Sequence, residues 1–164
     1  MLLGSDEADH QMVLFEDPQC PYCRRFEETS GEVLKTAREA GRLAVEYRMR
    51  CFLGVESVRA DNALALAAEA GRFDELRTVL FANQPAEGTG GFTIEDLHEL
   101  GRLAGLSSPD YESGVRDGRY FGWVLKVEAA LQEEDPQGTP AAWLDGQPVD
   151  PRVLTDPRVL ATRL

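Results

Sequence analysis

With 164 residues, the chain is long enough for one domain with a buried hydrophobic core, or for a core domain that carries one inserted subdomain. Hydrophobic residues make up 43% and charged residues 28%, the proportions of an ordinary globular protein. Seventeen Lys and Arg against 29 Asp and Glu give a net charge of −12, which repels nucleic-acid phosphates and anionic lipid surfaces. We therefore expect neither nucleic acid nor a membrane among its partners.

The N-terminal segment, residues 1–11, is polar and acidic, and we expect a mobile arm there. It has none of the features of a signal peptide, and no stretch of the chain approaches the ~20 apolar residues of a membrane span. If Met1 is the natural start, we expect a cytoplasmic protein. The alternative is an extracytoplasmic protein that has lost a leader.

The first regular elements follow this arm. Met12 to Phe15 is a continuous apolar run, which favours a central strand buried on both faces. A helical pattern then begins near Cys20 and ends at Gly41, and Ser30-Gly31 predicts a kink or a break within it. Alternation over residues 43–49 predicts a second strand.

The middle of the chain, residues 57–134, has a helical pattern throughout. Thr93 and Asp96 have the spacing of a capping box at the start of one helix. Glycine- and proline-containing stretches divide the pattern into five predicted helices, residues 58–70, 73–83, 94–104, 111–115 and 120–133.

The C-terminal part returns to strands. Residues 141–149 predict a hairpin around the turn Asp145-Gly146. Asp150-Pro151 and Asp156-Pro157 each predict a helix that begins with an Asp cap and a proline in its first position. The order of strands and helices along the chain indicates an α/β protein with a helical insertion.

Two cysteines lie at the junction between the first strand and the first helix, in Cys20-Pro21-Tyr22-Cys23. A thiolate at the beginning of a helix is stabilised by unpaired backbone N–H groups and by the positive end of the helix dipole. This lowers a pKa that is roughly 8.5 for an ordinary cysteine. The spacing therefore favours a pair of thiols that form and break a disulfide.

Two motifs carry a family resemblance: FEDPQCPYCRRF at residues 15–26 and GTP at residues 138–140. They resemble the motifs of DsbA-like thiol-disulfide oxidoreductases of the thioredoxin superfamily, and the resemblance covers nearly the whole chain. It implies a thioredoxin-like fold with an inserted all-helical domain. The expected parts are the arm at 1–11, a thioredoxin-like domain at 12–56 and 135–164, and a helical insertion at 57–134.

The resemblance also implies a site and a reaction. Cys20 would be the exposed nucleophile and Cys23 the buried resolving thiol, opposite a cis bond between Thr139 and Pro140. Protein or peptide thiols and disulfides would be the substrates, with an unidentified redox partner. We expect no metal or other cofactor, and a monomeric chain, because the sequence shows no separate dimerisation domain. The implied catalytic residues are Cys20, Cys23 and Pro140, and the implied substrate-binding residues are Pro21, Tyr22 and Thr139.

Other interpretations of the dithiol stay open at this point. A four-ligand zinc site would need two more ligands, and Cys51, His10 and His98 have no recognisable spacing for it. Cys-Pro-Tyr-Cys also permits a glutaredoxin-like reductase that uses a low-molecular-weight thiol. A non-catalytic binding module with a thioredoxin fold is the third alternative.

Three further side chains have competing interpretations. Glu16 and Asp17 could relay a proton to Cys23, as a buried carboxylate on this strand does in many members of the family. Here the strand interior is apolar, so we interpret the two acids as a solvated strand end. Cys51 lies among apolar residues, which predicts a buried, inert thiol, and the alternative is a third thiol that traps or regulates the couple.

Overall fold

A computed structural model of the protein describes residues 1–133 and 138–164. Contacts divide the chain into two compact units. The sheet unit consists of Met1–Glu16, Tyr22–Arg48 and Pro136–Leu164, and the helical unit of Asp17–Pro21 and Met49–Asp135. The expected boundary at 134–135 lies outside the described residues. Within those residues, no helix combines the length and the apolar character needed to cross a membrane.

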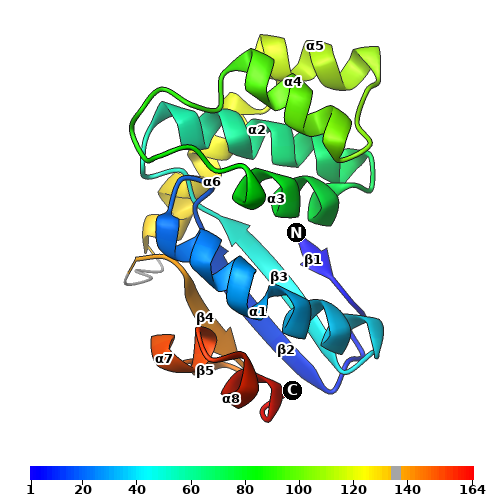
Figure 1. The fold of residues 1–164 in the computed structure, drawn as a ribbon, viewed down its shortest axis with the longest axis vertical. Coiled ribbons are helices and arrows are strands. Elements are labelled where there is room, and N and C mark those ends of the chain that lie inside the picture. The colour runs from blue at the N-terminus through cyan, green and yellow to red at the C-terminus, as the bar shows by residue number, and fades with distance from the viewer. Residues whose placement is uncertain (134–137) are drawn as a thin grey trace. The chain divides into compact units, whose positions relative to one another are not determined.

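The sheet unit is built on five strands in the order β1-β3-β2-β4-β5 (Figure 1). The central strand β2 pairs antiparallel with β4, and its residues Leu14 and Phe15 are buried, which confirms the predicted central strand. The second strand has the predicted bounds. The strands are β1 (Leu2–Leu3), β2 (His10–Glu16), β3 (Leu43–Met49), β4 (Ala141–Leu144) and β5 (Gln147–Pro148).

The prediction of a mobile arm over residues 1–11 is wrong. Leu2 and Leu3 form an edge strand that pairs antiparallel with β3, and β2 already begins at His10. The terminal amine of Met1 donates a hydrogen bond of 2.7 Å to the carbonyl of Tyr47. A two-residue strand is too short for a periodic pattern, so only the pairing reveals it.

Helix α1 (Pro21–Glu39) lies across one face of the sheet (Figure 1). It is continuous through Ser30 and Gly31, so the expected break is absent from it. The Ser30 hydroxyl is buried and donates a hydrogen bond of 2.6 Å to the carbonyl of Leu154. A partner outside the helix thus satisfies this serine, which would otherwise compete for its own helix's backbone.

The C-terminal strands and helices agree closely with those predicted from the sequence. Strands β4 and β5 form the predicted hairpin, whose turn residues Asp145 and Gly146 have φ of 51° and 77°. Positive φ at both positions is what a two-residue hairpin turn requires. Helices α7 (Pro151–Leu154) and α8 (Pro157–Ala161) each begin with the predicted Asp cap and proline.

The helical unit contains the five predicted helices, with ends that shift by up to three residues. Helix α2 contacts each of the other four and buries more than half of its residues. The capping box of Thr93 and Asp96 is confirmed. The helices are α2 (Val55–Glu69), α3 (Phe73–Ala82), α4 (Ile94–Leu103), α5 (Pro109–Asp117) and α6 (Phe121–Glu133).

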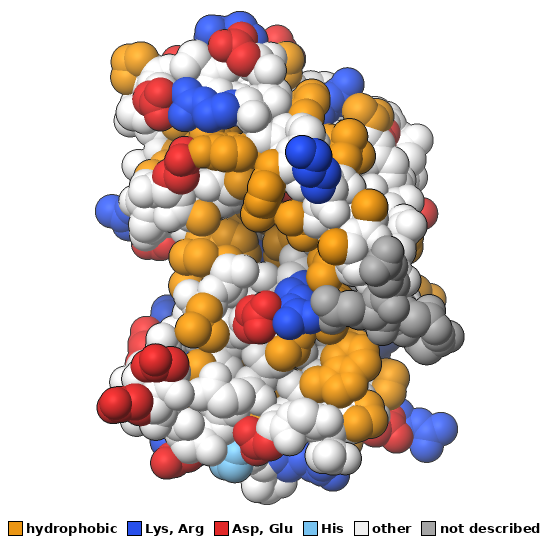
Figure 2. Space-filling view, turned by 180° about the vertical axis from the view of Figure 1, so that it is seen from behind, with side chains coloured by type: hydrophobic (Ala, Val, Ile, Leu, Met, Phe, Trp, Pro, Cys, Tyr) orange, Lys and Arg blue, Asp and Glu red, His pale blue; other side chains and the backbone are white. Residues whose placement is uncertain are grey.

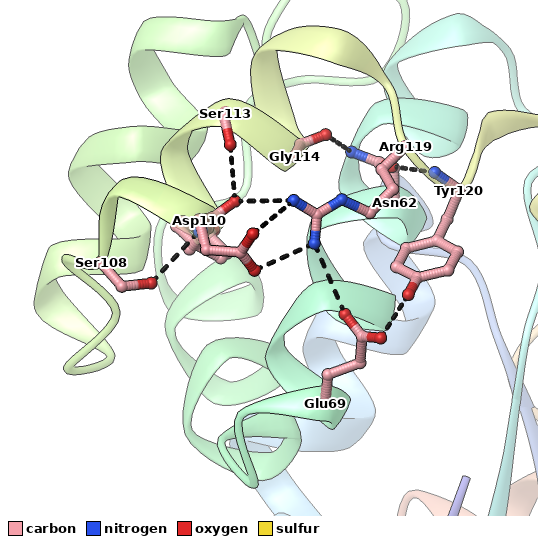
Figure 3. Close-up of polar contacts among 9 residues, drawn as sticks. Asn62, Glu69, Ser108, Asp110, Ser113, Gly114, Arg119 and Tyr120 are labelled. Atoms are coloured by element: carbon pink, nitrogen blue, oxygen red, sulfur yellow. Dashed lines mark hydrogen bonds and ion pairs between the residues drawn. The ribbon is translucent and has the colours of Figure 1, made fainter.

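Polar contacts connect α2 to α5 and to the turn before α6 (Figure 3). The side chain of Asn62 donates to the carbonyl of Gly114 at 3.2 Å and accepts from the amide of Tyr120 at 2.7 Å. Arg119 pairs with Asp110 in two hydrogen bonds, of 3.0 and 2.7 Å. The buried Asn62 side chain is thus satisfied on both its donor and its acceptor side.

The acidic excess is not gathered into one patch on the face that Figure 2 shows, where acidic and basic side chains are interspersed. Hydrophobic side chains also reach the surface there. A surface of mixed charge is ordinary for a globular protein.

Candidate active site

The cysteine motif begins where the central strand ends. Residues 17–20 connect β2 to α1, and the amide of Cys20 donates to the carbonyl of Asp17 at 2.9 Å, which closes a tight turn. Cys20 directly precedes Pro21, the first residue of α1, and Cys23 lies in the first turn of that helix. The predicted position at a strand-to-helix junction is therefore confirmed. A 19-residue helix presents its positive end to a thiolate in this position.

Both cysteines of the motif are buried thiols. Cys20 is 5% exposed and Cys23 is 0% exposed, whereas Tyr22 between them is 68% exposed. The expectation of an exposed Cys20 is wrong, although the order of the two exposures is as predicted. The backbone beside Cys20 is also bound from outside the motif, because the Gln84 side chain donates to the carbonyls of Pro18 and Cys20, at 2.8 and 3.0 Å.

Gln19 anchors the same segment to the helical unit. Its amide nitrogen donates to the carbonyl of Leu53 at 3.2 Å and to the hydroxyl of Ser57 at 3.0 Å. Its amide oxygen accepts from the backbone of Gly88 at 3.1 Å. The segment that ends in Cys20 is thus hydrogen-bonded to two other stretches of the chain, residues 53–57 and residues 84–88.

Asp17 is a buried carboxyl group, 0% exposed. Its Oδ1 accepts from the hydroxyl of Ser57 at 2.6 Å and the amide of Gln19 at 2.9 Å, and its Oδ2 accepts from the amide of Leu53 at 3.2 Å. Burial raises the pKa of Asp17 to about 6; these three hydrogen bonds oppose the rise, and a negative charge at Cys20 adds to it.

The interpretation of Glu16 and Asp17 as a solvated strand end is wrong, because Glu16 is also 0% exposed. Two of the groups that bind Asp17 belong to Leu53 and Ser57, 36 and 40 residues away in sequence. Sequence reasoning could not find these contacts, since a serine in a helical pattern carries no signal of its partner. The sequence signal for an acid near the cysteines was the pair Glu16-Asp17 itself, which stands shortly before Cys20.

The predicted site residues are divided between the two units. Cys20 and Pro21 group with the helical unit, and Tyr22, Cys23, Thr139 and Pro140 group with the sheet unit. The bond between Thr139 and Pro140 is cis, the isomer that the resemblance implies. Both residues are half-buried, directly before β4. The catalytic and substrate-binding roles of these residues stay predictions.

The third cysteine lies beside a buried ion pair. Arg50 donates to Glu128 in two hydrogen bonds of 2.9 and 2.8 Å, and the amide of Cys51 donates to the same carboxylate at 3.0 Å. Burial acts to raise the pKa of Glu128, but these contacts outweigh it and the pKa lies below its ordinary value.

Cys51 itself is 5% exposed, which confirms its predicted burial. Burial raises the pKa of its thiol to about 12, and the acidic groups of Asp61, Glu128 and Asp17 add to the rise. A thiol with this pKa carries almost no thiolate at neutral pH, so it is a poor nucleophile and a poor metal ligand. The ion pair beside Cys51 was not predicted, since Arg50 and Glu128 are 78 residues apart.

The two histidines have other partners. His10 lies 2.8 Å from Asp145, and His98 lies 2.9 Å from the carbonyl of Glu112. In the part of the chain that the structure describes, no group of three His, Cys, Asp or Glu side chains could hold a metal ion. Nothing in this geometry favours the zinc interpretation of the cysteines.

Comparisons with known proteins agree with this fold. The family model described as Thioredoxin matches residues 1–156. The structure resembles MdbA from Actinomyces oris, a thiol-disulfide oxidoreductase, with a TM-score of 0.85 and 18% identity over 99% of this chain and 82% of that one.

Two further solved structures are similar. BdbD from Bacillus subtilis matches with a TM-score of 0.84 and 20% identity over 99% of this chain and 89% of that one. DsbA from Mycobacterium tuberculosis matches with a TM-score of 0.78 and 23% identity over 91% of this chain and 83% of that one. No curated protein sequence matches the chain. The expected α/β, thioredoxin-like fold with inserted helices is confirmed.

Proposed function

The chain belongs to the thioredoxin family, and from this premise we propose that it is a thiol-disulfide oxidoreductase of the DsbA-like type. Cys20 and Cys23 exchange their disulfide with dithiols of protein or peptide substrates. The observation that carries the proposal is the position of Cys20 directly before α1, with Cys23 in the first turn. The names of the similar structures, thiol-disulfide oxidoreductases among them, support it.

In the oxidising direction, a substrate thiolate attacks the Cys20 sulfur. The bond between Cys20 and Cys23 breaks, Cys23 leaves as a thiolate that takes up a proton, and a mixed disulfide forms on Cys20. A second substrate thiolate attacks the substrate sulfur of this mixed disulfide and releases the Cys20 thiolate. Two electrons have then passed from the substrate to the protein, and the substrate carries a disulfide.

The same steps run backwards when the protein reduces a substrate. Cys20 attacks a substrate disulfide, and Cys23 then attacks Cys20 and displaces the reduced product. A Cys20 thiolate that is strongly stabilised favours the oxidising direction, because it stabilises the reduced protein. The reduction potential of the couple, measured by equilibration with glutathione, distinguishes an oxidant from a reductant.

Pro21, Tyr22 and Thr139 contact the substrate in this proposal, and Pro140 completes the catalytic site. The 68% exposure of the Tyr22 side chain supports a contact role, because this aromatic ring is available at the surface next to the dithiol. An extended substrate segment pairs with the backbone of Thr139 by strand addition.

Reduction of insulin by dithiothreitol tests the proposal. We expect the wild-type protein to accelerate this reduction and Cys20→Ala to abolish the acceleration. Cys23→Ala should accumulate a mixed disulfide that gel electrophoresis without reductant detects. Cys51→Ala is the matched control and retains the rate. Equal rates for the wild type and Cys20→Ala contradict the role of Cys20.

Two further measurements separate the alternative functions: turnover with a low-molecular-weight thiol, and the reactivity of the Cys20 thiol. Turnover that requires glutathione or mycothiol with its reductase indicates the glutaredoxin-like alternative. A protein without any dithiol-dependent turnover, whose Cys20 reacts like an ordinary thiol, indicates the binding module.

A further inference from the structure

Gln84 is a polar side chain that the proposed exchange does not use. It is half-buried and directly follows Asn83, the residue that caps the end of α3. Its amide nitrogen carries two hydrogens and donates to two carbonyls, that of Pro18 at 2.8 Å and that of Cys20 at 3.0 Å. Both donor positions of this amide are therefore used on the segment that carries the first cysteine.

The loop that follows α3, residues 84–92, is bound to the same segment a second time. The side-chain oxygen of Gln19 accepts from the backbone of Gly88 at 3.1 Å, so each of the two glutamines reaches from its own stretch of chain to the other. At the end of the loop, Phe92 is buried. All of these residues belong to the helical unit. The loop is thus anchored in that unit and holds Gln84 against the backbone of Cys20.

The carbonyl of Cys20 is a sensitive place for a hydrogen bond. It is bonded directly to the Cα that bears the thiol side chain, and it precedes Pro21, the first residue of α1. A carbonyl oxygen is the negative end of a dipole, and a donor at this oxygen offsets part of its charge. The amide of Gln84 therefore favours a negative charge on the Cys20 sulfur, and it does so from an element other than α1.

We propose that Gln84 is a positioning residue for Cys20: its amide holds the Cys20 backbone from the loop after α3 and favours the dithiol form over the disulfide form. This inference rests on the proposed function. In the disulfide form, the bond to Cys23 restrains Cys20 and leaves no charge on its sulfur. In the dithiol form that bond is absent, so the contact with Gln84 contributes more. Gln84 thus makes the protein a stronger oxidant.

The first test measures the reduction potential of the Cys20–Cys23 couple by equilibration with glutathione at neutral pH. One protein disulfide and two glutathione thiols give one protein dithiol and one glutathione disulfide. Gln84→Met keeps the length of the side chain and loses both donors. We expect the equilibrium constant for reduction of the protein to fall about two- to fivefold, up to the worth of one neutral hydrogen bond. The potential is then lower by about 10 to 20 mV.

Asn83→Leu is the matched control for this variant. Asn83 is the neighbouring residue and carries the same amide group, but it donates within its own helix, to the carbonyl of Val79 at 2.9 Å. We expect this variant to keep the wild-type potential. An equal shift in Asn83→Leu and Gln84→Met overturns the inference, because the loss of any amide at the end of α3 then has the same effect.

Gln84→Glu covers the case in which Gln84→Met fails to fold. A carboxylate has nearly the shape of the amide, but it has no donor, and its charge opposes a thiolate at Cys20. Asn83→Asp places the same charge one position away and measures the effect of the charge alone. We expect Gln84→Glu to lower the potential more than Asn83→Asp does. Equal shifts in these two variants overturn the inference.

Urea unfolding of both redox forms separates a positioning role from a merely structural one. If Gln84 only stabilises the fold, Gln84→Met lowers the free energy of unfolding equally in the disulfide and dithiol forms, and the potential stays at its wild-type value. A positioning role lowers the free energy of unfolding more in the dithiol form. Equal losses in the two forms therefore contradict the proposal.

Failure of this inference is distinct from failure of the proposed function. If Cys20→Ala abolishes the acceleration of insulin reduction but Gln84→Met has the wild-type potential, only the role of Gln84 is wrong. If Cys20→Ala retains the rate, the proposed function itself is wrong.

Discussion

Cys20 and Cys51 are equally exposed, at 5% each, but lie in different surroundings. Cys20 directly precedes a 19-residue helix, whose positive end favours a thiolate. Cys51 precedes a turn, and its own amide is bound to the carboxylate of Glu128. Exposure therefore does not distinguish the thiol that we propose to be reactive, Cys20, from the thiol of Cys51. The direction of the nearest backbone N–H groups and charges does.

The acids beside these cysteines show the same contrast. Glu128 has a guanidinium partner, and its pKa lies below the ordinary value. Asp17 accepts hydrogen bonds from the uncharged donors of Ser57, Gln19 and Leu53, and burial raises its pKa to about 6. Both acids are buried, so the presence of a cation decides in which direction the pKa moves.

The largest expected effect separates the two cysteines. At about pH 7.5, a thiol with a pKa of about 12 is ionised in less than one molecule in ~10⁴, so we expect iodoacetamide to modify Cys20 at least ~100-fold faster than Cys51. Site-resolved mass spectrometry of the reduced protein measures both rates. Similar rates contradict the comparison, and unfolding in urea serves as the control, because it should bring the two rates together.

The next effect concerns the ion pair beside Cys51. Arg50→Met leaves Glu128 buried without its cation, and we expect a loss of about 3 kcal/mol in the free energy of unfolding in urea. The double variant Arg50→Met with Glu128→Leu is the matched control and recovers most of the loss, because no buried charge is left. If the single and double variants are equally destabilised, the charge of Glu128 is not the cause.

The smallest effect concerns the acid beside Cys20. A folded-state pKa of about 6, raised from 3.8, contributes stability that is complete below about pH 4 and is lost as the pH rises through 6. The stability of the wild type minus that of Asp17→Asn should therefore fall by about 2 to 3 kcal/mol between about pH 4 and about pH 8. Urea unfolding at several pH values measures this difference, and a constant difference contradicts the assignment of Asp17.

Much of the fold could be predicted, because its elements are encoded locally. The strand at 43–49, the caps of Asp150 and Asp156 and the turn at Asp145-Gly146 depend on residues within a few positions of one another. The edge strand of Leu2 and Leu3 could not be predicted, since its partner is β3. The partner of the buried Ser30 hydroxyl within α1 could not be predicted either, since it is the carbonyl of Leu154, 124 residues away.

By itself, the sequence determined that two thiols lie at the beginning of a helix, in an α/β chain whose middle is helical. Spacing along the chain suffices for this, since the orientation of a helix's N–H groups follows from its first residues. Only the tertiary structure decided that Asp17 is buried and that Cys51 is beside an ion pair. Burial and partners depend on residues brought together from distant parts of the chain, and these set the charge of each group.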